Sequence, residues 1–100
     1  MEFKSVKGLS ENQVRYFEWL DHHTPYLLDL FEVELKQFSP ELVAKYLGIA
    51  SQRHAVMARF VLGVWRHQNH FDFDFVEAAL VLDRQEMTMI TDWMLDPFWP

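Results

Sequence analysis

The sequence predicts a single all-α domain over residues 1–100, a compact bundle of four to six helices around a central apolar helix at about residues 51–68. Apolar residues recur at helical spacing along most of the chain. Ser, Thr or Asp stands at the expected start of successive helices, twice followed by proline, which favours the first helical position. Three glycines and four prolines leave little room for long loops.

The first helix is predicted to follow an irregular lead over residues 1–9. The sequence SENQ at residues 10–13 fits the capping-box pattern, in which the glutamine side chain reaches back to the amide of Ser10. Apolar residues then recur at helical spacing. The helix is predicted to end near His22, because Pro25 disfavours helical geometry in the residue before it.

The second helix is predicted to start at Thr24 and Pro25 and to present apolar residues on one face as far as Phe38. Within it, Phe31–Lys36 alternates between apolar and polar residues, a pattern that is typical of a strand. Helix is the preferred interpretation of this segment, because its flanks are helical and no partner strand is evident.

The third helix is predicted to begin at Ser39 and Pro40 and to end at Gly48, which suits a left-handed C-terminal position. The fourth helix, at about residues 51–68, is apolar on most sides, and such a helix is buried on most sides. It is therefore placed at the centre of the bundle. Its non-bulky stripe consists of Gln52, Ala55, Arg59, Gly63, Arg66 and His70.

The last third of the chain is predicted to follow a turn at residues 67–74. It forms either one long helix or two short helices that meet near Asp83, since Asp74 and Asp83 are both favourable helix caps. An apolar tail is expected over residues 96–100.

Composition excludes several chemistries. The chain has no cysteine, which removes disulfides, thiolate nucleophiles and Cys-based metal sites, and favours a reducing cytoplasm. The densest apolar stretch, Ala55–Trp65, is too short to span a bilayer of about 30 Å, and the N-terminal residues lack the apolar core of a signal peptide. The serines are explained as helix caps. No catalytic residue, cofactor or metal ligand is predicted, and the protein is not expected to be an enzyme or to bind a membrane.

Charge is distributed unevenly along a chain whose net charge is −6. Residues 42–71 carry four basic side chains and no acid, whereas the flanking segments are acidic. The favoured interpretation is a basic central helix that acidic neighbours neutralise within the bundle. The alternative is a basic surface that meets an anion or an acidic partner.

Residues 42–49 resemble the first helix and turn of the helix-turn-helix family of DNA-binding motifs. In that family a small residue at the position of Ala44 lets the two helices approach, a glycine at the position of Gly48 turns the chain, and a residue at the position of Ile49 fills the core. The resemblance implies a recognition helix over residues 51–59.

The candidate contacts to DNA or to another anion are Gln52, Arg53, Arg59 and Arg66. Glutamine and arginine are competent readers of base edges, and the resemblance places Ser51, Gln52 and Arg53 near the bases. Arg59 and Arg66 flank small residues of the stripe, where they could hold an anion by bidentate hydrogen bonds. Alternatively they pair with internal acids such as Glu18 or Asp92.

An excess of apolar side chains carries the first functional hypothesis. Sixteen aromatic residues and five methionines are many for one small core. The surplus gathers in Trp65, Phe71, Phe73, Phe75, Trp93, Met94, Phe98 and Trp99. The terminal aromatic residues either fold back over the bundle or meet a second subunit, and the candidate self-association surface consists of Trp93, Met94, Phe98 and Trp99. Aromatic residues and methionine are enriched at interfaces, and a homodimer is the commonest closed assembly.

Three hypotheses about function follow. The first is a small non-enzymatic interaction or adaptor protein that self-associates through this surface. The second is a DNA-binding regulator that uses residues 42–59. The third is a helical bundle with a small-molecule pocket among its aromatic side chains.

Overall fold

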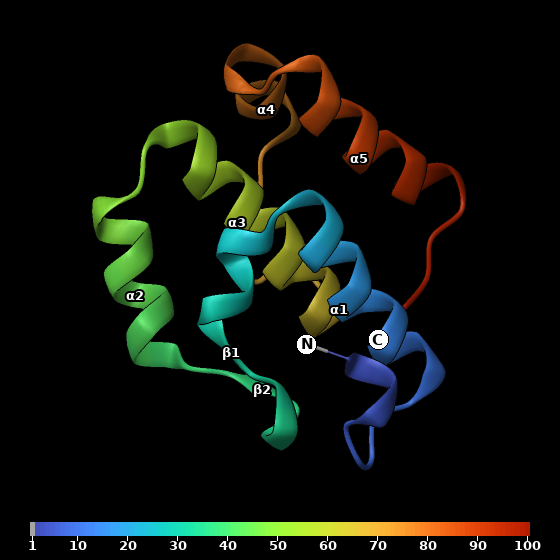
Figure 1. Cartoon of the computed structure of the whole chain (residues 1–100). Helices are drawn as coiled ribbons and strands as arrows, with labels where there is room; N and C mark the ends of the chain where they lie inside the picture. The colour runs from blue at the N-terminus through green and yellow to red at the C-terminus, as the bar shows by residue number, and fades with distance from the viewer. Residues whose placement is uncertain (1) are drawn as a thin grey trace.

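The computed structural model describes residues 2–100 and shows a mostly helical bundle, with about 70% of these residues in helices. The predicted all-α fold class is confirmed, with one small two-stranded sheet as the exception (Figure 1). The elements in chain order are η1 (Phe3–Ser5), α1 (Glu11–His23), η2 (Pro25–Leu30), β1 (Phe31–Glu32), η3 (Val33–Leu35), β2 (Gln37–Phe38), α2 (Pro40–Ile49), α3 (Gln52–Arg66), α4 (Phe75–Val81) and α5 (Arg84–Leu95), where η denotes a 3-10 helix.

Polar side chains cap the start of each α-helix, as the sequence predicts. The caps are Ser10, Ser39, Ser51, Asp74 and Asp83. Ser10 and Asp83 each form a complete capping box, with Gln13 and Glu86 respectively. Because Asp83 caps a new helix, the last third of the chain forms two helices rather than one.

The predicted helix over residues 25–38 is wrong. A 3-10 helix forms over Pro25–Leu30, and the antiparallel strands β1 and β2 follow, with Phe31 opposite Phe38. Lys36 adopts a left-handed backbone (φ 54°), which closes the turn between the strands. The alternation marks a strand only at its first two residues, where Phe31 enters the core and Glu32 faces solvent; Val33–Leu35 forms a 3-10 turn and Leu35 is exposed.

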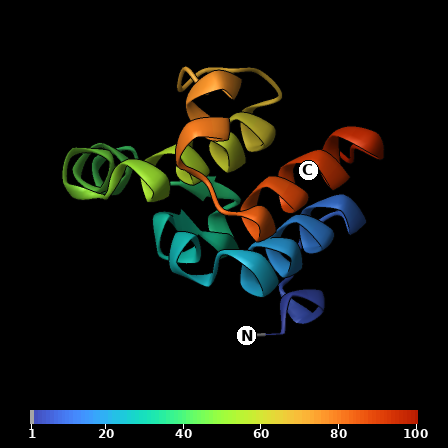
Figure 2. The same cartoon turned by 90° about the horizontal axis from the view of Figure 1, so that it is seen from above.

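The centre of the bundle is α3, as predicted. Its fully buried side chains include Val56, Met57, Val61 and Leu62. α1 and α5 lie beside it (Figures 1 and 2). The Tyr16 hydroxyl donates a hydrogen bond of 2.6 Å to the Val61 carbonyl, which ties α1 to α3 through the core.

α2 stands away from the rest of the bundle (Figure 2). It presents Val43 to the core, but Ala44 and Ile49 are exposed, Ile49 to 76%. Gly48 lies within the helix without a positive φ, and a Cβ there would meet nothing within 4 Å. The three positions that carry the helix-turn-helix resemblance therefore lack its packing, because the chain turns later, at Ala50, before Ser51 caps α3.

Residues 3–5 of the lead are ordered against the core. The lead contains the 3-10 turn η1, whose Phe3 is buried and stacks on Phe17 with ring centroids 5.7 Å apart. None of the helices within residues 2–100 has both the length and the apolar character that crossing a membrane requires.

Candidate functional site

Phe98, a member of the candidate self-association surface, is a core residue. It is only 7% exposed, its ring lies 5.3 Å from that of Trp19, and the Arg15 guanidinium sits 4.2 Å above it. The tail folds back over the bundle because the Trp93 indole N–H donates a 3.0 Å hydrogen bond to the Phe98 carbonyl. Of the two alternatives for the terminal aromatic residues, Phe98 therefore follows the one in which the tail folds back over the bundle.

The other three residues of the predicted surface remain accessible to different degrees. Trp93 is partly buried, whereas Met94 is half-exposed and Trp99 is 45% exposed. The ring of Trp99 packs edge-on against Trp93 at 5.0 Å and lies 5.3 Å from the ring of His67. The His67 Nε2 atom lies 2.7 Å from the Pro100 carbonyl oxygen, so the tail is held against the C-terminal end of α3.

A cleft of about 270 Å³ opens between α3, the loop that follows it and the tail. We call it the aromatic cleft, because its lining includes Phe60, Phe73, Phe75, Trp93 and Trp99. Neighbouring rings meet edge to face or at a tilt, with centroids 5.0 to 5.5 Å apart. Phe75, at the start of α4, is 56% exposed. The cleft is thus walled by aromatic rings that only partly cover one another.

The loop between α3 and α4 gives the cleft its shape. His67 ends α3 in a left-handed conformation, and Asp72 is also left-handed (φ 59° for both). The Asn69 side chain holds the loop by accepting from the Phe73 N–H at 2.7 Å and donating to the Phe73 carbonyl at 3.0 Å. Gly63 lets the loop pass close to α3, since a Cβ there would lie 3.2 Å from the Gln68 carbonyl oxygen, a tight contact that the loop backbone would have to relieve.

Most polar groups around the aromatic cleft already have partners. The Asn69 amide binds the loop backbone, and the Trp93 indole and the His67 ring bind the tail. Arg59 faces Glu77 of α4, with Nη1 and Oε1 3.7 Å apart. The cleft therefore offers aromatic surface and few unpaired polar groups.

The basic residues at the N-terminal end of α3 are paired with acids of α4 and α5. Arg53 Nε lies 2.8 Å from both carboxylate oxygens of Glu86, and its Nη2 lies 3.1 Å from Asp83. Hydrogen bonding to Glu86 raises the pKa of Arg53 above its usual range. Gln52 donates to Glu77 at 3.1 Å.

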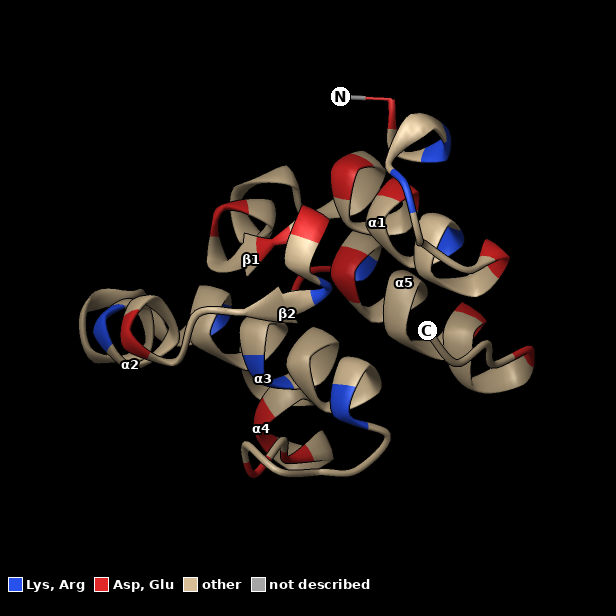
Figure 3. Cartoon of the chain, turned by 90° about the horizontal axis from the view of Figure 1, so that it is seen from below, with Lys and Arg blue, Asp and Glu red and all other residues tan. Residues whose placement is uncertain are grey.

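Three of the four candidate contacts to DNA or to another anion therefore have carboxylate partners within the bundle. They are Gln52, Arg53 and Arg59. For Arg59 the acid is Glu77 rather than the expected Glu18 or Asp92. Figure 3 shows basic segments of α3 beside acidic segments of α4. Arg66 is exposed and forms no ion pair within residues 2–100.

Phe73 and Phe75, which belong to the predicted surplus of apolar side chains, line the cleft, with Phe73 partly buried and Phe75 exposed at the rim. Phe60 was not predicted as a site residue, because it lies within the apolar α3 and looks like any other core position in the sequence. No group of three or more histidines and carboxylates within residues 2–100 is arranged to hold a metal ion.

Comparison of the chain with protein-family models, curated proteins and solved structures gives no match. The fold and the site define a small, mostly α-helical bundle with one aromatic cleft and a folded-back tail. Function is therefore inferred from the geometry and chemistry of these residues.

Proposed function

We propose that this chain is a small interaction protein without enzyme activity, which self-associates through the aromatic cleft and its rim. The observation that carries the proposal is the half-exposure of Phe75 and Trp99 on two sides of a cleft with aromatic walls. Contiguous exposed aromatic surface is typical of sites of protein association. Trp93, Met94 and Trp99 remain in the proposed surface, and Phe98 does not.

The size and polarity of the aromatic cleft favour a protein partner over a small molecule. Pockets for small molecules usually enclose roughly 300–1,000 Å³ and present several convergent polar groups. This cleft is smaller, at about 270 Å³, and most of its polar groups are occupied. Its volume suits one large apolar side chain of a partner, which is the usual form of an interface hot spot.

A second copy of this chain offers such a side chain. In a two-fold symmetric dimer, Trp99 of each protomer would enter the partner's cleft, so that each surface serves as donor and acceptor. Burial of one large apolar side chain contributes about 2 kcal/mol, and the symmetry supplies two of them. We therefore expect a dimer that dissociates on dilution rather than an obligate one.

The absence of cysteine supports assignment of the protein to a reducing compartment, the cytoplasm. There it would act as an adaptor whose assembly state depends on its concentration.

Sedimentation velocity over a range of concentrations tests the proposal. The wild-type protein is expected to change from monomer to dimer as concentration rises. W99A removes both inserted side chains of the symmetric dimer, together with one wall of each cleft, and is expected to weaken the dimer by about two to three orders of magnitude. L35A is the matched control, since Leu35 is 64% exposed but lies outside the cleft. A wild-type protein that stays monomeric up to about 1 mM, or equal effects of both variants, would contradict the proposal.

A further inference from the structure

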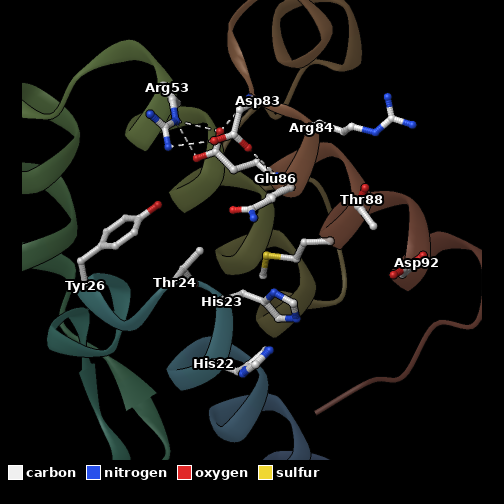
Figure 4. Close-up of a pocket in the computed structure, with 12 residues that line it drawn as sticks. His22, His23, Thr24, Tyr26, Arg53, Asp83, Arg84, Glu86, Thr88 and Asp92 are labelled. Carbon is white, nitrogen blue, oxygen red and sulfur yellow. Dashed lines mark hydrogen bonds and ion pairs between the residues drawn. The ribbon is translucent and has the colours of Figure 1, made fainter.

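A second hollow, separate from the aromatic cleft, lies between the C-terminal end of α1 and the exposed face of α5 (Figure 4). We call it the polar pocket; its lining includes His23, Thr24, Tyr26, Glu86 and Asp92. Its volume of about 560 Å³ lies within the range of roughly 300–1,000 Å³ that small-molecule sites occupy. Unlike the aromatic cleft, it gathers hydroxyl, imidazole and carboxylate groups from three segments.

The hydroxyl of Thr24 is a buried polar group at the polar pocket that lacks a hydrogen-bond partner among the described residues. Thr24 is 2% exposed, and its Oγ1 is the only buried side-chain oxygen or nitrogen within residues 2–100 without a hydrogen-bond partner. Nearly all buried polar atoms in folded proteins are paired. The backbone fixes this residue, because its N–H donates to the Leu20 carbonyl at 2.7 Å and ends α1. Its side chain extends from the α1–η2 junction toward α5 (Figure 4).

The charges around the polar pocket favour a cation. Arg53 is shared between two carboxylates, those of Asp83 and Glu86, and the side chain of Arg84 extends away from the pocket (Figure 4). Asp92 forms no ion pair within residues 2–100. The C-terminal end of α1, which carries the negative end of the helix dipole, lies at the same place. The N-terminal end of α5 also borders the pocket, but its positive dipole end already faces the carboxylates of the capping box, Asp83 and Glu86.

The titratable side chains at the pocket leave this negative potential in place. Burial lowers the pKa of His23, the neighbouring His22 lowers it further, and Asp92 only partly opposes them, so the ring is mainly neutral at pH 7. Burial raises the pKa of Tyr26 to about 12, so its hydroxyl stays protonated. Arg84 borders the pocket without an ion-pair partner among residues 2–100, but its guanidinium extends outward from the rim (Figure 4), whereas Thr24 Oγ1 and Asp92 leave unpaired acceptors for a cation.

The electronegative surface continues beyond the polar pocket. His22, His23 and Asp92 also line a neighbouring groove between α1 and α5, to which Glu18 and Asp96 contribute carboxylates. The Arg15 side chain of this groove is placed over the ring of Phe98. Carboxylates are thus spread along the groove rather than gathered at one point, which suits a ligand with more than one positive charge.

We propose that the polar pocket binds a small aliphatic amine with two or more amino groups. One ammonium group donates a hydrogen bond to Thr24 Oγ1, and another is held by the charge of Asp92 and the groove beyond it. An ammonium group has three donors and no acceptor, so it complements an unpartnered hydroxyl oxygen and carboxylates together. This binding is independent of the self-association proposed above.

Isothermal titration of the full chain with spermidine at low ionic strength tests the proposal. Saturable one-to-one binding is expected for the wild type. T24V keeps the shape of the side chain and removes the hydroxyl, and D92N removes one charge; each is expected to weaken spermidine binding about fivefold or more. E34Q is the matched control, because Glu34 is exposed on η3, outside both the polar pocket and the groove.

Circular dichroism checks that each variant is folded; T24V is expected to fold at least as stably as the wild type, because it removes a buried unpaired hydroxyl. Unchanged binding by T24V would overturn the role of the hydroxyl, and with it the proposal. An equal loss in D92N and E34Q would show diffuse attraction to an acidic protein and would overturn it as well, as would the absence of saturable binding by the wild type.

Discussion

Tyr16 joins the two halves of the core at the scale of a single residue. It is fully buried, and its ring lies within 5.3 to 5.8 Å of those of Phe17, Trp19, Phe31 and Trp65. Its hydroxyl donates to the Val61 carbonyl at 2.6 Å. Aromatic packing and a satisfied hydroxyl thus occur in one side chain, which is the condition under which tyrosine is favourable in a core.

Replacement of Tyr16 by phenylalanine tests this role. Y16F is expected to lower the free energy of unfolding by about 1 kcal/mol, because it keeps the ring and removes one buried hydrogen bond. Urea denaturation measures the change. If Y16F is as stable as the wild type, the hydrogen bond to α3 contributes nothing to folding.

The ionisation of Tyr16 predicts a loss of stability at high pH. Burial raises the pKa of Tyr16 well above its usual value of 10.0 in the folded state, whereas the unfolded chain titrates near that value. The folded state therefore keeps its proton where the unfolded state loses it, so the contribution of Tyr16 to stability is constant below pH 10 and falls as pH rises above it. The fall is expected to be less steep in Y16F, as urea midpoints between pH 8 and about pH 11 would show; parallel profiles of the two proteins would refute this origin.

At the scale of the element, helix starts were the most predictable feature of the chain. The signals at Ser10, Ser39 and Asp83 are local, because a cap needs only a side chain and the backbone two or three residues ahead. The hairpin at residues 31–38 was missed, since strands of two residues gain their stability from the aromatic core behind Phe31 rather than from local propensity. The sequence likewise predicts that the third helix ends at Gly48 and that Ile49 fills the core. In the structure α2 continues through Ile49, whose side chain is exposed, because α2 packs on the bundle only through a few side chains such as Val43.

Asp83 combines a helix cap with an ion pair, and two substitutions separate these roles. D83A is expected to lower the free energy of unfolding by about 1 to 2 kcal/mol, because it removes the cap of α5 together with the contact to Arg53. D83N is expected to lose less than about 1 kcal/mol, since asparagine still caps and exposed ion pairs contribute little. Denaturant titration of both variants provides the check; equal losses would assign the effect to charge.

At the scale of the whole molecule, the apolar side chains of the C-terminal third divide between the core and the surface. Trp93 and Trp99 line the aromatic cleft and Met94 is half-exposed on α5, whereas Phe98 completes the core next to Trp19. The cleft itself could not be predicted, because it depends on a loop with two left-handed residues that brings Phe73 and Phe75 opposite the tail. Such long-range closure leaves no periodic signal in the sequence.

The polar pocket was equally hidden from the sequence. Thr24 was expected to cap a helix, but the structure shows no cap hydrogen bond from its side chain. Its unpaired state depends on how α1 and α5 meet in the folded bundle.

The four tryptophans allow the central claim, self-association through the aromatic cleft, to be tested in one titration. Heteronuclear NMR of the indole N–H groups over a dilution series follows each ring separately. We predict that the Trp99 signal moves with protein concentration, whereas the signals of Trp19 and Trp65, which pack against the core, stay in place. Four indole signals that are all independent of concentration would contradict the claim.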